Sequence, residues 1–305
     1  MSAPTSASAQ ALVDDVAARI AAHDDVTRPF VTLSWAQSLD GSMANAPEAS
    51  EERLMLSGSA SMAMTHGLRG VHDAILVGRG TVTGDNPRLT VRLAADGSAV
   101  DVAAAQQPAA IVLDGDARTP PDCALMEQAA AGRKVIIVVA GGLDPPADLG
   151  ERVGELAKRR AKILYSTPRI VLYDRGTDTY SVDEELAKCV SATELDMGRV
   201  LRQLMKDKIW LGCSVRSIFV EGGVSVVDAL LRRPEEVDEV IVTVAPVFVG
   251  GVGPASSPFA GGPARLRRVA SLAVGDDVVI RGTFAADAPA NEAADDRPPK
   301  RARTD

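Results

Sequence analysis

The sequence contains few of the residues from which metal sites and disulfide frameworks are built. Its 305 residues include only three cysteines and three histidines. The cysteines, at positions 123, 189 and 213, are widely spaced and odd in number, which gives neither a disulfide framework nor a zinc-type C-x-x-C pair. The histidines lack the H-E-x-x-H and H-x-E spacings of zinc enzymes. We therefore expect no metal site, and a reducing, intracellular compartment.

Long apolar runs and an excess of positive charge are also missing. No stretch of 18 apolar residues occurs, so no segment is predicted to span a membrane. The first residues, MSAPTSASAQ, lack the basic and apolar regions of a secretory signal. The formal net charge of −8 argues against binding to nucleic acid or to an anionic membrane, because both require clustered lysine and arginine. We expect a cytoplasmic protein whose partners are small molecules or proteins.

Apolar residues are plentiful enough for a large buried core. They make up 46% of the chain, and residues 29–286 are predicted to form a single catalytic domain. Residues 1–28 are predicted to be a partly disordered N-terminal leader, and residues 287–305 a disordered tail, because both ends are rich in small, polar and charged residues. Lys300 to Arg303 resembles a nuclear-import patch, but such short basic clusters often arise by chance. We interpret the patch as part of a solvated tail.

Short β-branched runs alternate with helical patterns between the two ends. Strands are predicted at 31–35, 74–77, 110–113, 134–139, 169–173, 217–220, 239–245 and 278–284. Helices are predicted at 55–69, 123–131, 147–160, 196–207 and 225–232. Runs such as KVIIVVA are apolar throughout, which is typical of strands covered on both faces. The predicted fold class is α/β, with a mostly parallel central sheet, helices on both faces and an antiparallel C-terminal edge.

The stretch LVGRGTVTGDNPRLTVR, residues 76–92, is a near match to a dinucleotide-binding fingerprint. Gly78 and Gly80 have the right spacing, but Thr83 stands where a third glycine belongs. The following GDNPR is a turn sequence, so we expect a polar loop in place of the helix that a Rossmann site requires. That loop offers hydroxyls, a carboxylate and two arginines, from Thr81, Thr83, Asp85, Arg88 and Arg92. It is either a nucleotide site of another kind or simply a connection.

A second stretch, SIFVEGGVSVVDALLRR, has the context of a phosphate site. A predicted strand ends in Glu221, Gly222 and Gly223, and Ser225 is placed to cap the helix that follows. Paired glycines allow an anion to approach the backbone, and the positive end of a helix favours it. The alternative is an ordinary strand-turn-helix connection. Glu221, however, lies at the carboxyl end of a strand, where α/β proteins usually place their chemistry.

Two further stretches complete the pattern. In TLSWAQSLDGSMA a strand is followed by a turn at Asp40, whose carboxylate either bonds its own backbone or faces a pocket. In TVAPVFVGGVGP a strand ends in a loop rich in proline and glycine.

In this order and spacing, the four stretches resemble the pyrimidine reductases of riboflavin biosynthesis. The resemblance covers residues 29–285 and implies a dihydrofolate-reductase-like fold, NADPH as cofactor and a homodimer. Bacterial members carry a zinc deaminase domain in front, marked by H-x-E and P-C-x-x-C motifs that this sequence lacks. The chain is therefore similar to the stand-alone fungal and archaeal type, which reduces 2,5-diamino-6-ribosylamino-4(3H)-pyrimidinone 5′-phosphate. Residues 29–286 are, on this resemblance, a reductase domain.

The resemblance also implies roles for individual residues. The cofactor would be contacted by Gly80, Thr81, Asp85, Gly222, Gly223, Val224 and Ser225. The substrate, a phosphorylated pyrimidine, would be contacted by Arg69, Leu89, Arg92 and Glu221. The sequence departs from the family at Asn86, where a second aspartate is usual, and at Thr83, where an apolar residue is common. The segment 94–107 and both ends of the chain lie outside the resemblance.

The implied reaction converts a ribosylamino group to a ribitylamino group. Arginine binds phosphate by paired, charge-assisted hydrogen bonds, so Arg69 and Arg92 suit the 5′-phosphate. Opening of the sugar requires proton transfer, for which Glu221 and, second, Asp40 are the candidates. Arg79 and Arg118 are candidates for selecting NADPH over NADH. The competing hypotheses are another pyrimidine or pterin-like reductase on the same fold, and a nucleotide-binding protein without turnover.

Overall fold

The structure, a computed structural model, describes residues 6–44, 55–140, 147–166, 171–174, 179–182, 195–206, 215–250 and 264–284. The expected tail at 287–305 lies outside the described residues, and so does its basic patch. No helix within the described part of the chain is long and apolar enough to cross a membrane.

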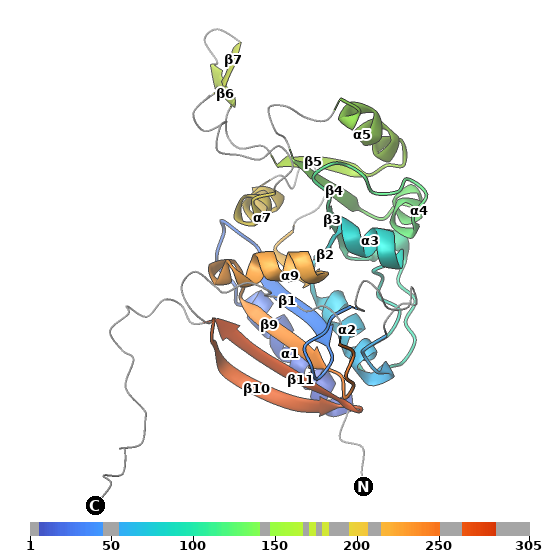
Figure 1. Cartoon of the computed structure of the whole chain (residues 1–305), viewed down its shortest axis with the longest axis vertical. Coiled ribbons are helices and arrows are strands. Elements are labelled where there is room, and N and C mark those ends of the chain that lie inside the picture. Colours follow the sequence, from blue (N-terminus) through green and yellow to red (C-terminus); the bar gives the residue numbers. More distant parts are fainter. Residues whose placement is uncertain are drawn as a thin grey trace, which may run out of the picture.

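A nine-stranded sheet organises the described residues (Figure 1). In sheet order its strands are β10 (Leu266–Val274), β11 (Asp277–Phe284), β9 (Glu239–Val244), β1 (Phe30–Gln37), β8 (Ser217–Glu221), β2 (Ala74–Gly78), β3 (Ala109–Leu113), β4 (Val135–Ala140) and β5 (Lys162–Ser166). The strands from β9 to β5 run parallel, whereas β10 and β11 form an antiparallel hairpin at one edge. A turn at Gly275, with φ of +63°, joins the two hairpin strands.

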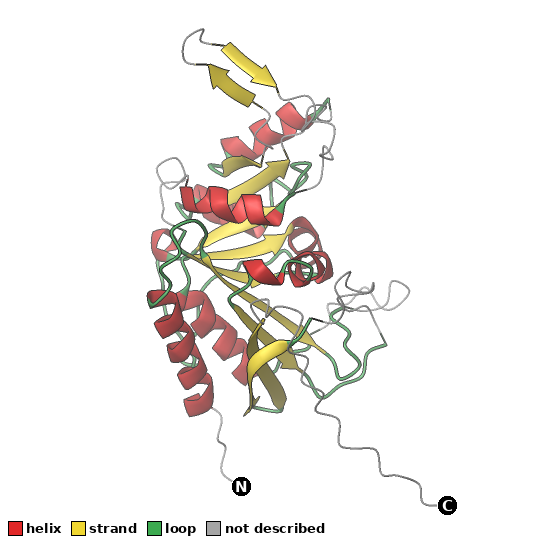
Figure 2. Cartoon of the chain, turned by 90° about the vertical axis from the view of Figure 1, so that its left-hand side faces the viewer, coloured by secondary structure: helices red, strands yellow, loops and turns green. Residues whose placement is uncertain are grey.

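The central strands are apolar on both faces because helices cover both faces (Figure 2). One face packs against α7 (Met197–Lys206) and α9 (Val224–Leu231). The other face packs against α1 (Ser6–Ala21), α2 (Ser59–Val71), α4 (Ala124–Ala130) and α5 (Leu149–Lys158). The predicted fold class, a mostly parallel sheet with helices on both faces and an antiparallel C-terminal edge, is confirmed.

Part of the predicted N-terminal leader is helical, whereas its residues 1–5 lie outside the described residues. Residues from Ser6 onward form α1, and Ala9, Leu12, Val13 and Val16 are buried beneath β8, β9 and the β10–β11 hairpin. These positions repeat with the spacing of one helix face, so burial of that face stabilises the helix. The serines and alanines of the segment are compatible with helix formation, although their composition is also that of disordered chains.

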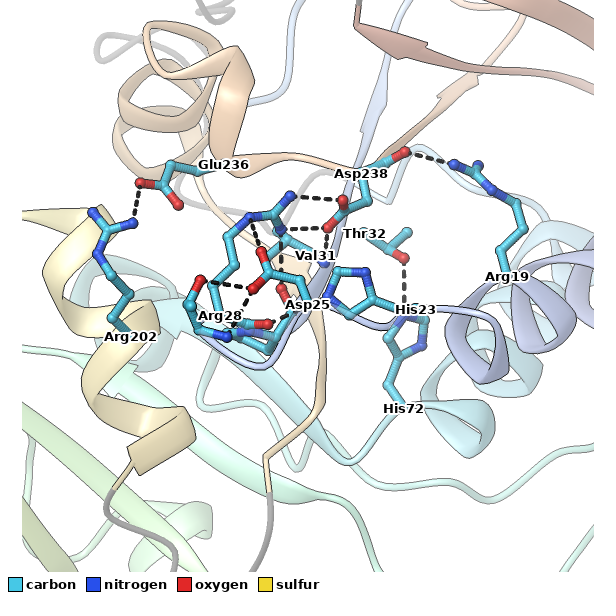
Figure 3. A network of polar contacts seen from close by, with 12 residues as sticks. Arg19, His23, Asp25, Arg28, Val31, Thr32, His72, Arg202, Glu236 and Asp238 are labelled. Atoms are coloured by element: carbon cyan, nitrogen blue, oxygen red, sulfur yellow. Dashed lines mark hydrogen bonds and ion pairs between the residues drawn. The ribbon is translucent and has the colours of Figure 1, made fainter. Parts of the chain in front are cut away.

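Polar contacts hold the segment after α1 against the start of β9, at the amino ends of the parallel strands (Figure 3). Arg28 donates two hydrogen bonds, of 2.6 and 2.8 Å, to the carboxylate of Asp238. The same carboxylate accepts the amide of Val31 at 2.8 Å, and Arg19 donates to the Asp238 carbonyl at 2.9 Å. Each carboxylate oxygen therefore has a donor, which offsets the cost of burying the pair.

Several smaller elements differ from the sequence expectations. The strand predicted at 169–173 is β6 (Val171–Asp174), which pairs with β7 (Thr179–Val182) in a separate two-stranded sheet. Strands β5, β7 and β10 were not predicted. Strand β10 is largely exposed and carries charged and small residues, so it lacks an apolar signature. Short 3-10 turns lie at Ala104–Gln106 and Pro234–Glu236.

Candidate active site

A cavity of about 710 Å³ opens at the carboxyl ends of β1, β2 and β8. Parallel α/β sheets characteristically place their ligands at this edge, because the turns that follow neighbouring strands meet there. The lining includes ten of the predicted site residues: Arg69, Gly80, Thr81, Asp85, Leu89, Glu221, Gly222, Gly223, Val224 and Ser225. Asp40 and Arg92 are not among its lining residues.

The stretch after β2 is a helix, so the expectation of a polar loop there is wrong. Helix α3 (Arg79–Asp85) begins directly after Gly78 and buries Val82 against the sheet. It ends at Asn86, which has the left-handed φ of +42°, and Pro87 follows. The turn sequence GDNPR therefore ends the helix after seven residues but does not prevent it.

The turn after β8 leads into α9 one residue earlier than predicted. Gly223 is the N-cap and the helix starts at Val224, so Ser225 lies inside the first turn and is not the cap. No side chain caps the N-terminus of α9, and the same holds for α3. The first backbone amides of both helices are thus left to other acceptors, such as an anionic ligand.

Glycine is required in both turns because the backbones pass close to α9. A Cβ atom on Gly222 would lie 2.7 Å from the Cβ of Val226, and one on Gly78 would lie 2.9 Å from a methyl group of Val226. A Cβ on Gly223 would lie 3.2 Å from the hydroxyl of Thr81. The turns after β2 and β8 are therefore adjacent, and they bring the N-termini of α3 and α9 together at one side of the cavity.

Glu221 and Arg69 form a bidentate ion pair in the wall of the cavity. Nε of Arg69 donates to Oε1 of Glu221 at 2.6 Å, and Nη2 donates to Oε2 at 2.6 Å. The remaining terminal nitrogen, Nη1, donates to the carbonyl of Thr90 at 3.1 Å. Glu221 ends β8 and Arg69 lies in the last turn of α2, so the pair joins the sheet to the helix beside it.

Burial would by itself lower the pKa of Arg69, but the charge and hydrogen bonds of Glu221 outweigh burial and raise the pKa. Arg69 therefore stays protonated, and only 8% of its surface is exposed. A guanidinium held in this way cannot turn toward a ligand without breaking the pair, and breaking a buried pair is costly.

Asp40 has a different setting from Glu221. Its carboxylate accepts hydrogen bonds from the hydroxyls of Ser38 and Ser42 and from the amides of Val249 and Gly250. These bonds, that of Ser38 first, hold the pKa of Asp40 well below its usual range. The carboxylate thus ties the turn after β1 to the loop after β9, which is the turn-forming alternative raised by its sequence context.

Arg92 is exposed at the outer end of the loop that follows α3. Its guanidinium donates to the hydroxyl of Thr90 at 3.1 Å, and its amide donates to Nδ1 of His66 at 3.1 Å. Burial, together with the charges of Arg69 and Arg92, lowers the pKa of His66 to about 4. His66 is therefore neutral at physiological pH and acts as an acceptor for this loop.

The cavity also contains residues that the motifs did not single out. Strand β1 contributes Ser34, Trp35 and Ala36, and the α2 segment contributes Met62 and Thr65. Trp35 donates from its ring nitrogen to the side chain of Gln37 at 2.8 Å, which leaves its ring as an apolar wall. Its position at the end of a predicted strand beside the Asp40 turn was a signal that could have identified it.

No group of three or more histidine, cysteine, aspartate or glutamate side chains suited to a metal ion occurs among the residues that the structure describes. The charged side chains of the cavity wall are instead the paired Arg69 and Glu221, together with Asp85, beside the starts of two helices. Such a wall can bind an anionic nucleotide and hold a charged group near it.

Residues 29–280 match the family model of the RibD C-terminal domain. The protein belongs to this family. The match includes β1, the cavity and most of the sheet, whereas α1 precedes it.

Members of the RibD C-terminal domain family with curated names are similar over most of the chain. The 2,5-diamino-6-ribosylamino-4(3H)-pyrimidinone 5′-phosphate reductase of Saccharomyces cerevisiae is 30% identical over 75% of this chain and 77% of its own length. The protein of the same name from Methanothermobacter thermautotrophicus is 32% identical over 73% of this chain and 81% of its own length.

Solved structures of the family share the fold. RibD of Acinetobacter baumannii superimposes with a TM-score of 0.61 at 21% identity, over 85% of this chain; the match spans 59% of that longer protein. The Saccharomyces cerevisiae riboflavin biosynthesis reductase Rib7 superimposes with a TM-score of 0.54 at 24% identity, over 86% of this chain and 92% of its own. At these identities the superpositions establish the fold alone.

Proposed function

We propose that the protein is an NADPH-dependent reductase of riboflavin biosynthesis. Its substrate is 2,5-diamino-6-ribosylamino-4(3H)-pyrimidinone 5′-phosphate, and its product carries a ribitylamino group. The observation that carries the proposal is the placement of the Arg69–Glu221 pair in the same cavity as the two glycine turns. Two relatives named for this activity, each about 30% identical over most of their length, support it.

The cavity fits a dinucleotide cofactor in both size and chemistry. About 710 Å³ lies within the usual range of ligand pockets, and the wall combines apolar side chains with uncapped helix amides. Gly222, Gly223, Val224 and Ser225 would hold cofactor phosphate at the start of α9, with Gly80 and Thr81 facing them from α3. Asp85 would contact the cofactor from the end of α3. When bound, NADPH supplies the hydride that reduces the sugar carbon.

Selection of NADPH over NADH is assigned to Arg79, with Arg118 as a second contributor. Arg79 lies between Gly78 and Gly80 at the start of α3, and its Nε lies 3.5 Å from Oδ1 of the buried Asp114. The contact is an ion pair without a hydrogen bond, and 42% of the Arg79 side chain remains exposed. An exposed guanidinium beside the cavity suits the additional phosphate that distinguishes NADPH.

Arg92 is the better of the two arginines for the substrate's 5′-phosphate. Arg69 donates three hydrogen bonds within the protein, two to Glu221 and one to Thr90. Its role is therefore to hold Glu221 in place, with contact to the substrate as a secondary role. Arg92 presents an exposed guanidinium on the loop whose Leu89 lines the cavity. Leu89 would pack against the pyrimidine.

Glu221 is assigned the proton transfer that opens the sugar. In this step the bond between C1 and the ring oxygen breaks, the exocyclic nitrogen loses a proton, and the ring oxygen gains one, which leaves an imine at C1. A carboxylate held in the cavity wall can take the first proton and return the second. Arg69 keeps both oxygens of Glu221 oriented during the exchange. Asp40, with its oxygens engaged by two loops, is assigned a positioning role.

The experiment that tests the proposal follows NADPH absorbance with purified protein and two substrates, the diamino ribosylamino compound and its deaminated counterpart. Turnover on the diamino compound is the expected result. A preference for the deaminated compound would place reduction after deamination. Tight NADPH binding without oxidation of either would contradict the proposal and favour a different pyrimidine or pterin-like substrate, or a binding protein.

We also propose that the protein is a cytoplasmic homodimer. Leu39, Val247 and Phe248 are exposed apolar side chains on adjacent loops, joined by the hydrogen bond from the amide of Leu39 to the carbonyl of Val247. Exposed apolar groups of this kind are candidates for a subunit contact. Light scattering after size-exclusion chromatography would measure the mass, and a monomer at micromolar concentration would contradict the dimer.

A further inference from the structure

The loop that leaves α3, residues 86–92, has a backbone conformation that its sequence alone does not favour. Asn86 and Leu89 both have left-handed φ values, of +42° and +50°. Asparagine tolerates this region, but leucine rarely adopts it because its Cβ meets the following carbonyl. Leu89 is nevertheless buried and lines the cavity. Contacts from elsewhere in the fold must therefore hold the peptide in this conformation.

Those contacts come from α4 and the turn that follows it, at the outer side of the loop. The side-chain oxygen of Asn86 accepts the amide of Ala124 at 2.8 Å, at the first residue of α4. Gln128 donates to the carbonyl of Arg88 at 3.0 Å. These two contacts hold the side chain of Asn86 and the carbonyl of Arg88, which precede Leu89 in the loop. Helix α4 therefore supports the loop.

Arg133 makes the closest set of contacts with the loop. Its Nη1 donates to the carbonyl of Arg88 at 2.7 Å, and its Nη2 donates to the carbonyl of Leu89 at 2.7 Å. Its Nε donates to the carbonyl of Pro108 at 2.9 Å, and Nη1 also donates to Oε1 of Gln128 at 2.6 Å. One planar guanidinium thus fixes two successive carbonyls of the loop, a geometry that only the rigid fork of arginine provides.

The acceptors of Arg133 are neutral oxygens, which is unusual for a buried cation. Its residue exposure is 2%, and the ion pairs found among the described residues do not include it. Burial first, and then the charge of Arg69, lower the pKa of Arg133 to about 10, so the group remains charged at neutral pH. Burying a charge without a carboxylate partner costs free energy. The hydrogen bonds by which Arg133 orders the backbone of the loop offset this cost.

We propose that Arg133 is a positioning residue for substrate binding: it holds the left-handed peptide at Leu89, and thereby places Leu89 in the cavity and sets the course of the loop that carries Arg92. The inference rests on the proposed function, because it takes the 86–92 loop as the substrate loop. The cofactor side of the cavity, at the starts of α3 and α9, has no hydrogen bond from Arg133 among those that the structure describes. Arg133 should therefore influence substrate binding and not cofactor binding.

The test compares Arg133→Met with Arg28→Met. Both replacements remove a largely buried guanidinium, but Arg28 binds Asp238 at the opposite end of the parallel strands. Loss of two hydrogen bonds that fix the loop is expected to raise KM for the substrate about tenfold in Arg133→Met. The dissociation constant for NADPH, measured by fluorescence without substrate, and kcat should change less than about twofold. Arg28→Met should lower the melting temperature without changing KM.

The inference is overturned if Arg133→Met leaves KM unchanged, or if NADPH affinity falls as much as substrate affinity. Arg133→Lys, which keeps the charge but not the fork, covers the case in which the methionine variant does not fold; it should also raise KM. Hydrogen exchange separates this inference from the proposed function. Faster exchange of the Val91 and Arg92 amides in Arg133→Lys is expected even if the wild type shows no turnover, and unchanged exchange would contradict the support by Arg133.

Discussion

The guanidinium of Arg69 and the carboxylate of Glu221 meet in two parallel hydrogen bonds of 2.6 Å, although 152 residues separate them in the chain. The pair fixes a guanidinium and a carboxylate in the wall of a cavity that also contains helix starts, apolar side chains and the side chains of several serines and threonines. Each partner limits what the other can do: Glu221 keeps Arg69 from serving as a free phosphate ligand, and Arg69 keeps Glu221 oriented.

Replacement of Glu221 by glutamine tests the proton-transfer role. The shape of the side chain is kept and its charge is lost, so kcat should fall by about two to four orders of magnitude with NADPH affinity nearly unchanged. The melting temperature should also fall, because Arg69 would be left without its counter-ion. Glu235→Gln, an exposed change in a turn remote from the cavity lining, is the control and should match the wild type. Full activity of Glu221→Gln would remove the residue from catalysis.

Removal of the Arg92 guanidinium tests phosphate recognition. In Arg92→Ala the KM for the phosphorylated substrate should rise by about tenfold or more, because a charge-assisted contact to phosphate is lost, while kcat is largely kept. Arg216→Ala removes an exposed arginine that precedes β8, at the other end of the strand from Glu221, and serves as the control. Steady-state kinetics with varied substrate would show the difference, and an unchanged KM would exclude Arg92 from this role.

Selection between the two nicotinamide cofactors should depend on Arg79. In Arg79→Gln the KM for NADPH should rise about tenfold while the KM for NADH stays the same, since only NADPH carries the additional phosphate. Arg267→Gln, an exposed arginine on β10, is the matched control. An equal rise in KM for both cofactors would indicate that Arg79 supports the fold through Asp114 and does not bind the additional phosphate.

A methyl group added at Gly222 tests the close approach of the turn to α9. Gly222→Ala would place its Cβ 2.7 Å from the Cβ of Val226, so the helix must shift. The free energy of unfolding should therefore fall by about 1–3 kcal/mol. NADPH affinity should fall with it, because the start of α9 moves. Gly154 lies on α5 with no atom within 4 Å of an added Cβ, so Gly154→Ala should instead raise the free energy of unfolding by about 0.5–1 kcal/mol. Denaturant titration and cofactor fluorescence would measure both; a neutral Gly222→Ala would contradict the packing described.

Acid should destabilise the fold through His72. Burial lowers the pKa of His72 to about 4, whereas the unfolded chain titrates near 6.5. The unfolded state therefore binds the proton more readily, so the contribution of His72 to stability is constant above about pH 6.5 and falls by up to about 3 kcal/mol as the pH drops to about 4. Its Nε2 lies 2.8 Å from the hydroxyl of Thr32 (Figure 3). Its Nδ1 donates to the Leu68 carbonyl at 2.7 Å, which by itself raises the pKa, but burial outweighs this bond. His72→Gln should show a shallower decline in denaturant titrations between these pH values, and an identical slope would refute the assignment.

The sequence predicted the sheet well because its central strands are apolar throughout, a pattern that does not depend on distant residues. It also predicted ten of the residues that line the cavity, through motifs that end strands. It could not predict that Arg69 pairs with Glu221 or that Arg133 supports Leu89, because these contacts join residues far apart in the chain. Nor could it show how Asp40 is used, since the partners of its carboxylate include the distant Val249 amide.

Two helices were missed for different reasons. In α3 the glycines and threonines disfavour a helix locally, and burial of Val82 outweighs that preference. In α1 the apolar residues at positions 9, 12, 13 and 16 do carry the helical period, so the signal was present but was masked by the surrounding serine and alanine.

The packing of α1 has a practical consequence for work with this protein. The match to the family begins at residue 29, and a fragment cut to that boundary would lose a helix whose apolar face covers Phe219, Ile241 and Val279. Those side chains would then form an exposed hydrophobic patch, and such a fragment would aggregate or bind chaperones. A polypeptide that retains the first turn of α1 keeps the surface covered.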